Sequence, residues 1–232
     1  MSSVVYADIP RVEDAILDRF RRSSVATLHE AFDRRGLVDT AIKPLRSGWR
    51  IVGRAITGLC RPNDNLALHC AVRTAQAGDV LVIAMEGWHQ YALWGELIAR
   101  AARELGAVGA VLDGPVRDAG DLADLNLLTW CRGSSAAGSI KSRVGGVNVP
   151  ISFGGITVSP GDIVVGDDDG LIVIPIDEAE AVLERADARE AFEVDARQRI
   201  AAGERLFDLL GLASAVEQAG IEFRDGTYRD RG

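Results

Sequence analysis

Several features that mark broad classes of protein are missing from this sequence. No segment reaches the roughly 18 uninterrupted apolar residues that a membrane-spanning helix needs. Residues 1–17 mix acidic side chains and a proline into their apolar positions, which is not the pattern of an export signal. We therefore expect a cytoplasmic protein that has no membrane as a partner.

Cysteines and basic clusters are also scarce. The three cysteines, Cys60, Cys70 and Cys131, are widely spaced and include no Cys-x-x-Cys pair, so we expect free thiols rather than disulfides or a structural zinc site. The formal net charge is -8, and no run of lysine or arginine exceeds two residues. The sequence thus predicts no basic surface that could bind the phosphate backbone of a nucleic acid, and we do not expect nucleic acid as a partner.

The chain shows no internal repeat, low-complexity linker or sharp change in composition. Its 232 residues are 47% hydrophobic, which is enough to bury a sizeable core. We therefore predict one α/β domain over residues 1–210, followed by a C-terminal tail over residues 211–232.

Hydrophobic periodicity predicts the elements of this domain. Helical spacing predicts two helices over 11–36 and further helices over 65–76, 89–105 and 177–203. Apolar or β-branched runs predict strands at 48–60, 78–85 and 109–114, and several short strands between 146 and 175. The strand, helix and strand between 78 and 114 favour a parallel pair. The helix over 89–105 places seven apolar residues on one stripe: Ala92, Leu93, Leu97, Ile98, Ala101, Ala102 and Leu105.

Charged residues gather around the end of the strand at 109–114, where packing explains them poorly. They are Glu96, Asp113, Arg117, Asp118 and Asp121. One or two carboxylates can hold Mg²⁺, which keeps several of its waters, and an adjacent arginine can stabilise an enolate oxygen. The alternative is a surface ion pair between Arg117 and Asp118, with Asp121 capping the next turn.

Other candidate sites are weaker. The segment 86–90 precedes the predicted helix, whose first N–H groups could bind a carboxylate, and His89 could act there as a base or as a simple cap. The triplet 167–169 lacks the spacing of a calcium loop and is better interpreted as a tight acidic turn. No serine-nucleophile motif or phosphate-binding loop is present.

Seven segments together resemble one known family. They are VATLHEAFDRRGL (25–37), NDNLALHCAV (63–72), AGDVLVIA (77–84), WGELIA (94–99), GAVLDGPVRD (109–118), SIKSRVGGVNVPI (139–151) and PGDIVVGDDDGLIVIP (160–175). The chain is similar to the class II pyruvate aldolases acting on 4-hydroxy-4-methyl-2-oxoglutarate and 4-carboxy-4-hydroxy-2-oxoadipate, relatives of the ribonuclease regulator RraA. The resemblance implies an α/β sandwich with a swivelling β/β/α core that assembles as a homotrimer or homohexamer.

The family's metal motif is an acidic residue, twenty intervening residues and then Arg-Asp. Glu96 and Arg117-Asp118 match it, and Asp121 fills the place of an acid found in aldolase members. The resemblance implies a Mg²⁺ or Mn²⁺ cofactor with Asp118 as direct ligand, and Glu96 and Asp121 binding the surrounding waters. Glu193 matches a glutamate that a neighbouring subunit contributes.

The resemblance also implies the substrate contacts. Arg117 is expected on the keto oxygen of a small oxo acid, and Arg117, Asp118 and Glu96 are the expected catalytic residues. Backbone amides of the loop over 87–95 are expected to take the pyruvyl carboxylate, and Trp94, Gly95, Glu96 and Leu97 are the expected substrate-binding positions beside Arg117.

Three other functions compete with the aldolase. The first is a non-catalytic regulator of a ribonuclease, against which Asp121 and the complete metal motif speak. The second is a methyltransferase, which lacks support because no glycine-rich nucleotide loop is present. The third is a related keto-acid lyase with another substrate. The bulky Trp88 and His89 in the substrate loop keep the identity of the substrate open.

Overall fold

The computed structural model describes residues 4–87, 90–227 and 229 of the chain. The chain divides into two compact units, residues 1–186 and 187–232. The mixed α/β fold predicted from the sequence is confirmed in the first unit. The division into a domain over 1–210 and a tail over 211–232 stays a prediction.

The first unit is built on one mixed sheet. Within the described residues the sheet has eight strands, in the order β1-β5-β4-β3-β2-β9-β10, with β6 also paired to β2. Strands β2 to β5 are mutually parallel, whereas β1, β6, β9 and β10 run antiparallel to their neighbours. The bounds are β1 Lys43–Pro44, β2 Ile51–Cys60, β3 Asp79–Met85, β4 Gly109–Asp113, β5 Thr129–Cys131, β6 Gly146–Val147, β9 Ile163–Gly166 and β10 Leu171–Ile174.

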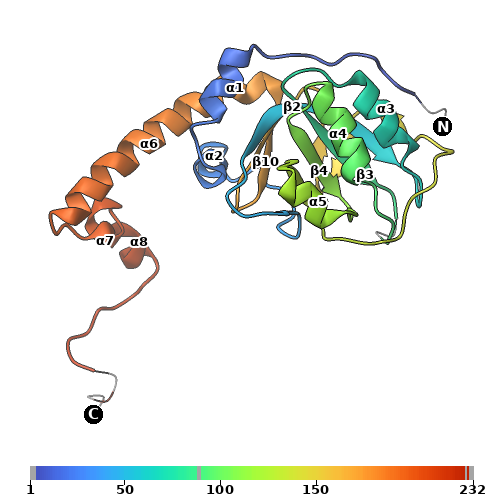
Figure 1. Cartoon of the computed structure of the whole chain (residues 1–232). Helices are drawn as coiled ribbons and strands as arrows, with labels where there is room; N and C mark the ends of the chain where they lie inside the picture. The colour runs from blue at the N-terminus through green and yellow to red at the C-terminus, as the bar shows by residue number, and fades with distance from the viewer. Residues whose placement is uncertain (1–3, 88–89, 228, 230–232) are drawn as a thin grey trace. The chain divides into compact units, whose positions relative to one another are not determined.

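Helices cover one face of this sheet. Figure 1 shows α3 (Leu66–Thr74), α4 (Glu96–Glu104) and α5 (Ala119–Asp124) over the same face. Their buried side chains pack against alternate residues of β2, β3 and β4, such as Ile56, Leu81 and Leu112. The crossover β3-α4-β4 joins two neighbouring parallel strands, as the sequence predicted.

A β-hairpin covers part of the opposite face. Strands β7 (Ile151–Phe153) and β8 (Ile156–Val158) form this separate two-stranded sheet. Phe153 is fully buried and belongs to the same cluster as Val80, Val82 and Val111 of the large sheet. Both faces of the central strands are therefore covered, which explains why β3 is buried along its whole length.

A third cluster covers one face of β9 and β10, at the end of the sheet. Helices α1 (Asp14–Phe20) and α2 (Val25–Ala31) pack there, together with the first two turns of α6 (Ala179–Ala201), which follows the short 3-10 helix η1 (Ile176–Glu178). The acidic turn between β9 and β10 anchors this region. Asp167 accepts a hydrogen bond from the N–H of Val25, and Asp168 accepts one from Ser47 Oγ.

The predicted helix over 89–105 is wrong in its start and in its buried stripe. The helix begins at Glu96, because the segment before it is extended and forms bridges through Ala92 and Trp94. Leu97 is 74% exposed, and the buried residues of α4 are Ala99 and Ala102. The predicted strands at 48–60, 78–85 and 109–114 are confirmed, as are the short strands between 146 and 175.

The second unit, residues 187–232, consists of the rest of α6 followed by α7 (Leu206–Leu209) and α8 (Ala213–Gln218). Helix α8 lies in the segment predicted as a tail. Many large apolar side chains of this unit are exposed: Phe192, Val194, Ile200, Leu206, Leu210, Leu212, Ile221 and Phe223.

Two expectations about the whole chain can be compared with the described residues. None of their helices has both the length and the apolar character to cross a membrane. The three cysteines are free thiols, as predicted.

Candidate active site

Three extended segments, which follow the carboxyl ends of β3, β4 and β5, form the base of the candidate site. Trp94 pairs with Val116, which in turn pairs with Ser134. The N–H of Arg117 donates to the carbonyl of Trp94 at 2.9 Å, and the N–H of Val116 donates to the carbonyl of Gly133 at 2.9 Å. These main-chain bonds hold Arg117 beside the start of α4, even though the two are distant in sequence.

Two glycines flank the side chain of Arg117. A Cβ at position 95 would lie 2.9 Å from Arg117 Cγ and 3.1 Å from its Nε, and a Cβ at position 138 would lie 3.4 Å from Nη1. A side chain at position 95 would therefore displace Arg117, whereas one at position 138 would only come into contact with the guanidinium. The side chain is 51% exposed, so its donors can reach a ligand.

Asp118 is held at the same place by the main chain. Its backbone is left-handed, at φ 56° and ψ 37°, a conformation that aspartate tolerates better than most residues. The carboxylate turns back to the start of α4, where Oδ2 accepts a hydrogen bond from the N–H of Glu96 at 3.2 Å. The same oxygen lies 3.5 Å from Arg117 Nε. The ion pair between Arg117 and Asp118, which the alternative interpretation expected, is thus present. Asp118 is also hydrogen-bonded to the main chain at the start of α4.

The predicted acidic residues are not gathered into one cluster. Glu96 Oε1 forms an ion pair with Arg100 of the same helix. Asp121 is exposed in the first turn of α5. Glu193 belongs to the second unit, where it pairs with arginines one turn before and after it. Among the described residues there is no group of three or more His, Cys, Asp or Glu that could hold a metal.

Asp113 does not join the site, contrary to the expectation that the charged residues crowd together. Its carboxylate forms an ion pair with Arg132, and Oδ2 accepts a hydrogen bond from the N–H of Gly154 in the β7–β8 turn at 2.9 Å. Asp113 is the last residue of β4, and Asp118 follows only after the turn. Side chains alternate between the two faces of a strand, and a turn separates Asp113 from Asp118. The two carboxylates therefore point to different surroundings.

One carboxylate nevertheless fits a hard divalent cation. Asp118 Oδ1 accepts no hydrogen bond from a described residue, whereas Oδ2 is fixed by Glu96. Asp118 lines an open cavity of about 410 Å³ together with Arg117, Ser134 and Ser135. Mg²⁺ commonly binds through one or two carboxylates and retains waters, so this donor set and this space suit it.

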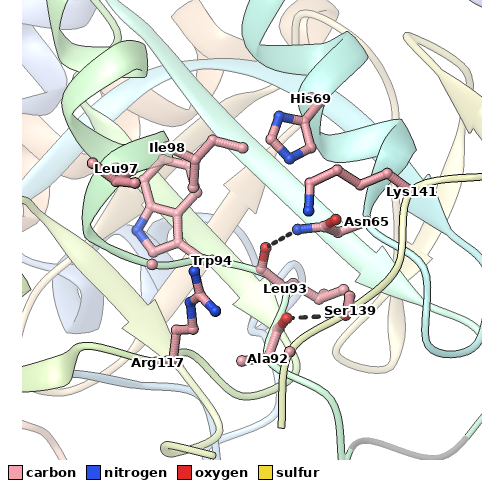
Figure 2. Close-up of a pocket in the computed structure, with 12 residues that line it drawn as sticks. Asn65, His69, Ala92, Leu93, Trp94, Leu97, Ile98, Arg117, Ser139 and Lys141 are labelled. Carbon is pink, nitrogen blue, oxygen red and sulfur yellow. Dashed lines mark hydrogen bonds between the residues drawn. The ribbon is translucent and has the colours of Figure 1, made fainter. Parts of the chain in front are cut away.

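A second cavity, of about 200 Å³, also has Arg117 in its lining (Figure 2). Trp94, Gly95 and Leu97, three of the positions expected beside Arg117 to bind substrate, line this cavity, whereas Glu96 does not; their role in substrate binding stays a prediction. Figure 2 shows Arg117 entering from one side and Lys141 from the other, with Asn65 and His69 beside the lysine.

Sequence reasoning missed three of the residues that line this second cavity: Asn65, His69 and Lys141. All three lie in segments that carry the family resemblance without a chemical motif of their own, and only the fold brings 63–72 next to 139–143. Burial and the charge of Lys141 lower the pKa of His69, so the imidazole is neutral at neutral pH. Trp88 and His89, which the sequence assigned to the substrate loop, lie outside the described residues.

Comparison with protein-family models matches residues 25–173 to the family described as RraA-like, Aldolase/RraA. The chain belongs to the RraA-like family. The match includes both cavities and ends before the second unit. The resemblance that the sequence motifs indicated is thereby confirmed.

Individual RraA-like relatives carry different names. A protein of Halalkalibacterium halodurans, named "Putative 4-hydroxy-4-methyl-2-oxoglutarate aldolase", is 38% identical over 189 residues, which cover 82% of this chain and 90% of that protein. An uncharacterised protein of Pseudomonas syringae has a solved structure that superimposes with a TM-score of 0.77 at 29% identity, over 87% of this chain and 95% of that one. Streptomyces coelicolor RraAS2, described as an unusual member of the RNase ES inhibitor RraA family, superimposes with a TM-score of 0.74 at 28% identity, over 82% of this chain and 99% of that one.

Proposed function

We propose that this RraA-like protein is a divalent-metal-dependent aldolase. Its substrate would be 4-hydroxy-4-methyl-2-oxoglutarate or 4-carboxy-4-hydroxy-2-oxoadipate, cleaved to pyruvate and a second keto acid. The observation that carries the proposal is the placement of Arg117 between two glycines, next to a carboxylate that keeps one oxygen open for a cation. The aldolase name of the relative at 38% identity supports the same activity.

The cleavage requires that an enolate be stabilised. When the C4 hydroxyl of the substrate loses its proton, the C3–C4 bond breaks, its electrons pass to C3 and the C2 oxygen, and C4 becomes the carbonyl of the released keto acid. Arg117 is assigned to the C2 oxygen, since its side chain lines the cavity and its two terminal nitrogens form no hydrogen bond with a described residue. A divalent cation at Asp118 would supply Lewis-acid polarisation of the keto group.

The remaining site residues have supporting roles. Glu96 fixes Asp118 through its N–H, and the next amides of α4 are open to the pyruvyl carboxylate, because the first N–H groups of a helix have no partner within it. Asp121 is our choice for the carboxylate that holds the water accepting the C4 hydroxyl proton. A water then protonates C3 of the enolate to give pyruvate. Decarboxylation of oxaloacetate passes through the same enolate and is the expected side activity.

The subunit arrangement is part of the proposal. We propose a homotrimer or homohexamer in which Glu193 of one chain completes the site of another. The exposed apolar side chains of the second unit support an assembly, because soluble chains rarely leave so many uncovered. Native mass spectrometry would give the number of subunits, and a monomer at micromolar concentration would contradict this part of the proposal.

The experiment that tests the activity measures pyruvate release from 4-carboxy-4-hydroxy-2-oxoadipate and from oxaloacetate, with Mg²⁺ and with EDTA. Asp118→Ala is the test variant, and Asp124→Ala, an exposed carboxylate on the same helix that Asp118 precedes, is its control. We expect release that needs the metal and Asp118 but not Asp124. Absence of release from both compounds would contradict the proposal and favour the second candidate.

The second candidate is a non-catalytic regulator of a ribonuclease. The superposition on Streptomyces coelicolor RraAS2, a member of a family of RNase inhibitors, favours it. A keto-acid lyase with another substrate would use the same residues and would still show metal-dependent decarboxylation of oxaloacetate.

A further inference from the structure

The cavity beside Arg117, lined also by Asn65 and Lys141, carries charge of one sign only. Arg117 and Lys141 are its charged lining residues, and none of the described residues that line it is an aspartate or glutamate. The chain as a whole has a formal charge of -8, so this local excess of positive charge is unlike the rest of the molecule. A cavity lined by one sign of charge attracts a ligand of the other sign.

Two polar atoms at the Lys141 end of this cavity, Lys141 Nζ and Asn65 Oδ1, have no hydrogen-bonding partner among the described residues. Within the described part of the chain, Lys141 Nζ forms no hydrogen bond or ion pair. Asn65 is 7% exposed, and its Oδ1 is buried without a hydrogen bond. Because Asn65 Nδ2 donates to the carbonyl of Leu93 at 2.8 Å, the amide orientation is fixed and Oδ1 remains the acceptor next to Lys141 (Figure 2). A buried acceptor is costly unless a donor reaches it, and a carboxylate ligand has no donor, so the Lys141 ammonium is the group that can satisfy both Oδ1 and a ligand carboxylate.

A fully buried carboxylate holds the loop that carries Lys141. Asp64 is 0% exposed and accepts four hydrogen bonds. Three come from the loop to Oδ2, from the N–H and Oγ of Ser142 and the N–H of Arg143, at 2.8 to 2.9 Å, and the fourth comes from the N–H of Leu66 to Oδ1. Burial alone would raise the pKa of Asp64, but these donors lower it overall, so the group is ionised at neutral pH.

Main-chain bonds complete this attachment. The N–H of Asn65 donates to the carbonyl of Ile140, and the N–H of Ile140 donates to the carbonyl of Asn63, each at 3.0 Å. Lys141 therefore extends from a segment fixed on both sides of it, rather than from a loop free to move away.

We propose that Lys141 binds the carboxylate on the acceptor half of the substrate, the half released as the second keto acid, and that Asp64 positions Lys141 for this contact. This assignment rests on the proposed function. The pyruvyl half occupies the other end of the cavity, where Gly95 and Arg117 lie next to Asp118. Lys141 reaches the cavity from the opposite side, where the acceptor half must extend. The site thus selects 2-oxo acids that carry a second, distal carboxylate.

Binding of two stable acids tests the assignment. Pyruvate contains only the first half, whereas 2-oxoglutarate adds a distal carboxylate and cannot undergo the cleavage because it lacks the C4 hydroxyl. Their dissociation constants are measured by calorimetry on the full chain with Mg²⁺. The variants are Lys141→Met and Asp64→Asn, and Arg143→Met is the control for loss of a positive charge in the same loop. Arg143 does not line the cavity, and its guanidinium donates to the carbonyl of Pro62 and lies 3.9 Å from Asp64 Oδ2, whereas the N–H that Asp64 accepts is kept in the variant.

The wild type is expected to bind 2-oxoglutarate at least about tenfold more tightly than pyruvate, the scale of one hydrogen bond to a charged group. Lys141→Met is expected to remove this preference and leave pyruvate affinity unchanged, Asp64→Asn to reduce it, and Arg143→Met to keep it. A preference that persists in Lys141→Met would overturn the assignment, as would equal weakening of both acids, which would put the pyruvyl carboxylate on Lys141. If the preference is lost in Lys141→Met but unchanged in Asp64→Asn, the positioning role is wrong. Failure of the wild type to bind either acid would overturn the proposed function as well.

Discussion

Replacing Gly95 with alanine should damage the site while leaving the fold intact. The new Cβ would lie 2.8 Å from Asp118 Oδ2, whereas ordinary contact begins near 3.4 Å, so the carboxylate must shift by about 0.6 Å. Arg117 must move by a similar amount, because its Cγ would lie 2.9 Å from the same Cβ. The backbone itself is extended at position 95 and imposes no conformational penalty on alanine.

The expected loss follows from these displacements. A misplacement of roughly 1 Å at a reacting centre can cost about a hundredfold in rate, so a shift of this size should lower kcat/KM by about tenfold or more. The cost in folding free energy should stay near or below the usual ~1–3 kcal/mol of overpacking, since the side chains that must yield are 51% and 38% exposed.

The assay is pyruvate formation from oxaloacetate, read beside a thermal unfolding curve. Gly120→Ala is the matched control, because no atom lies within 4 Å of its Cβ and it sits in the neighbouring helix α5. That variant should keep full activity and gain about 0.5–1 kcal/mol of stability. Full activity in Gly95→Ala would refute the reasoning that Asp118 and Arg117 are held in place for catalysis.

Three further predictions concern other parts of the first unit. Burial raises the pKa of Cys60 to about 12, so iodoacetamide at pH 8 should label the half-buried Cys70 first, and equally fast labelling of Cys60 would contradict this. The pKa of His69 is lowered below 6.5 by burial and by Lys141, so the unfolded chain binds the proton more readily and stability should fall as the pH drops below about 6.5. Lys141→Met should raise the pKa of His69 in NMR titration, and an unchanged value would mean that the lysine is not close enough to act. Phe20→Ala removes a fully buried ring of α1 and should cost about 3–5 kcal/mol in urea unfolding, whereas a loss below about 1 kcal/mol would mean that the cluster is loosely packed.

The sequence was sufficient to predict those helices and strands whose pattern of apolar residues matches the pattern of residues buried in the structure. Strand β3 is an apolar run with both faces covered, and α3 shows helical spacing, so both were predicted within two residues of their bounds. The start of α4 was not, because Ala92 and Leu93 fit a helical stripe equally well. Their extended conformation depends on pairing with segments near 116 and 138, which no local pattern reveals.

The residues of the candidate site also divide into those that the sequence could predict and those that only the fold reveals. Arg117 and Asp118 could be found from the sequence, because charge at the end of a buried strand needs an explanation. Lys141 and Asp64 could not, since each lies in a segment whose role depends on hydrogen bonds between residues 63–66 and 139–143. The separation of Asp113 from the others also depends on a tertiary partner, Arg132.

The exchange of the methyl protons of pyruvate in D₂O, followed by NMR with Mg²⁺ present, isolates the enolate step. This exchange requires the enolate but neither the acceptor half nor Lys141. We predict exchange by the wild-type protein, loss of that exchange with EDTA, and a decrease of about a hundredfold or more in Arg117→Ala, the scale of removing one donor to an oxyanion. Exchange at the wild-type rate in Arg117→Ala would contradict the claim that this residue stabilises the pyruvate enolate.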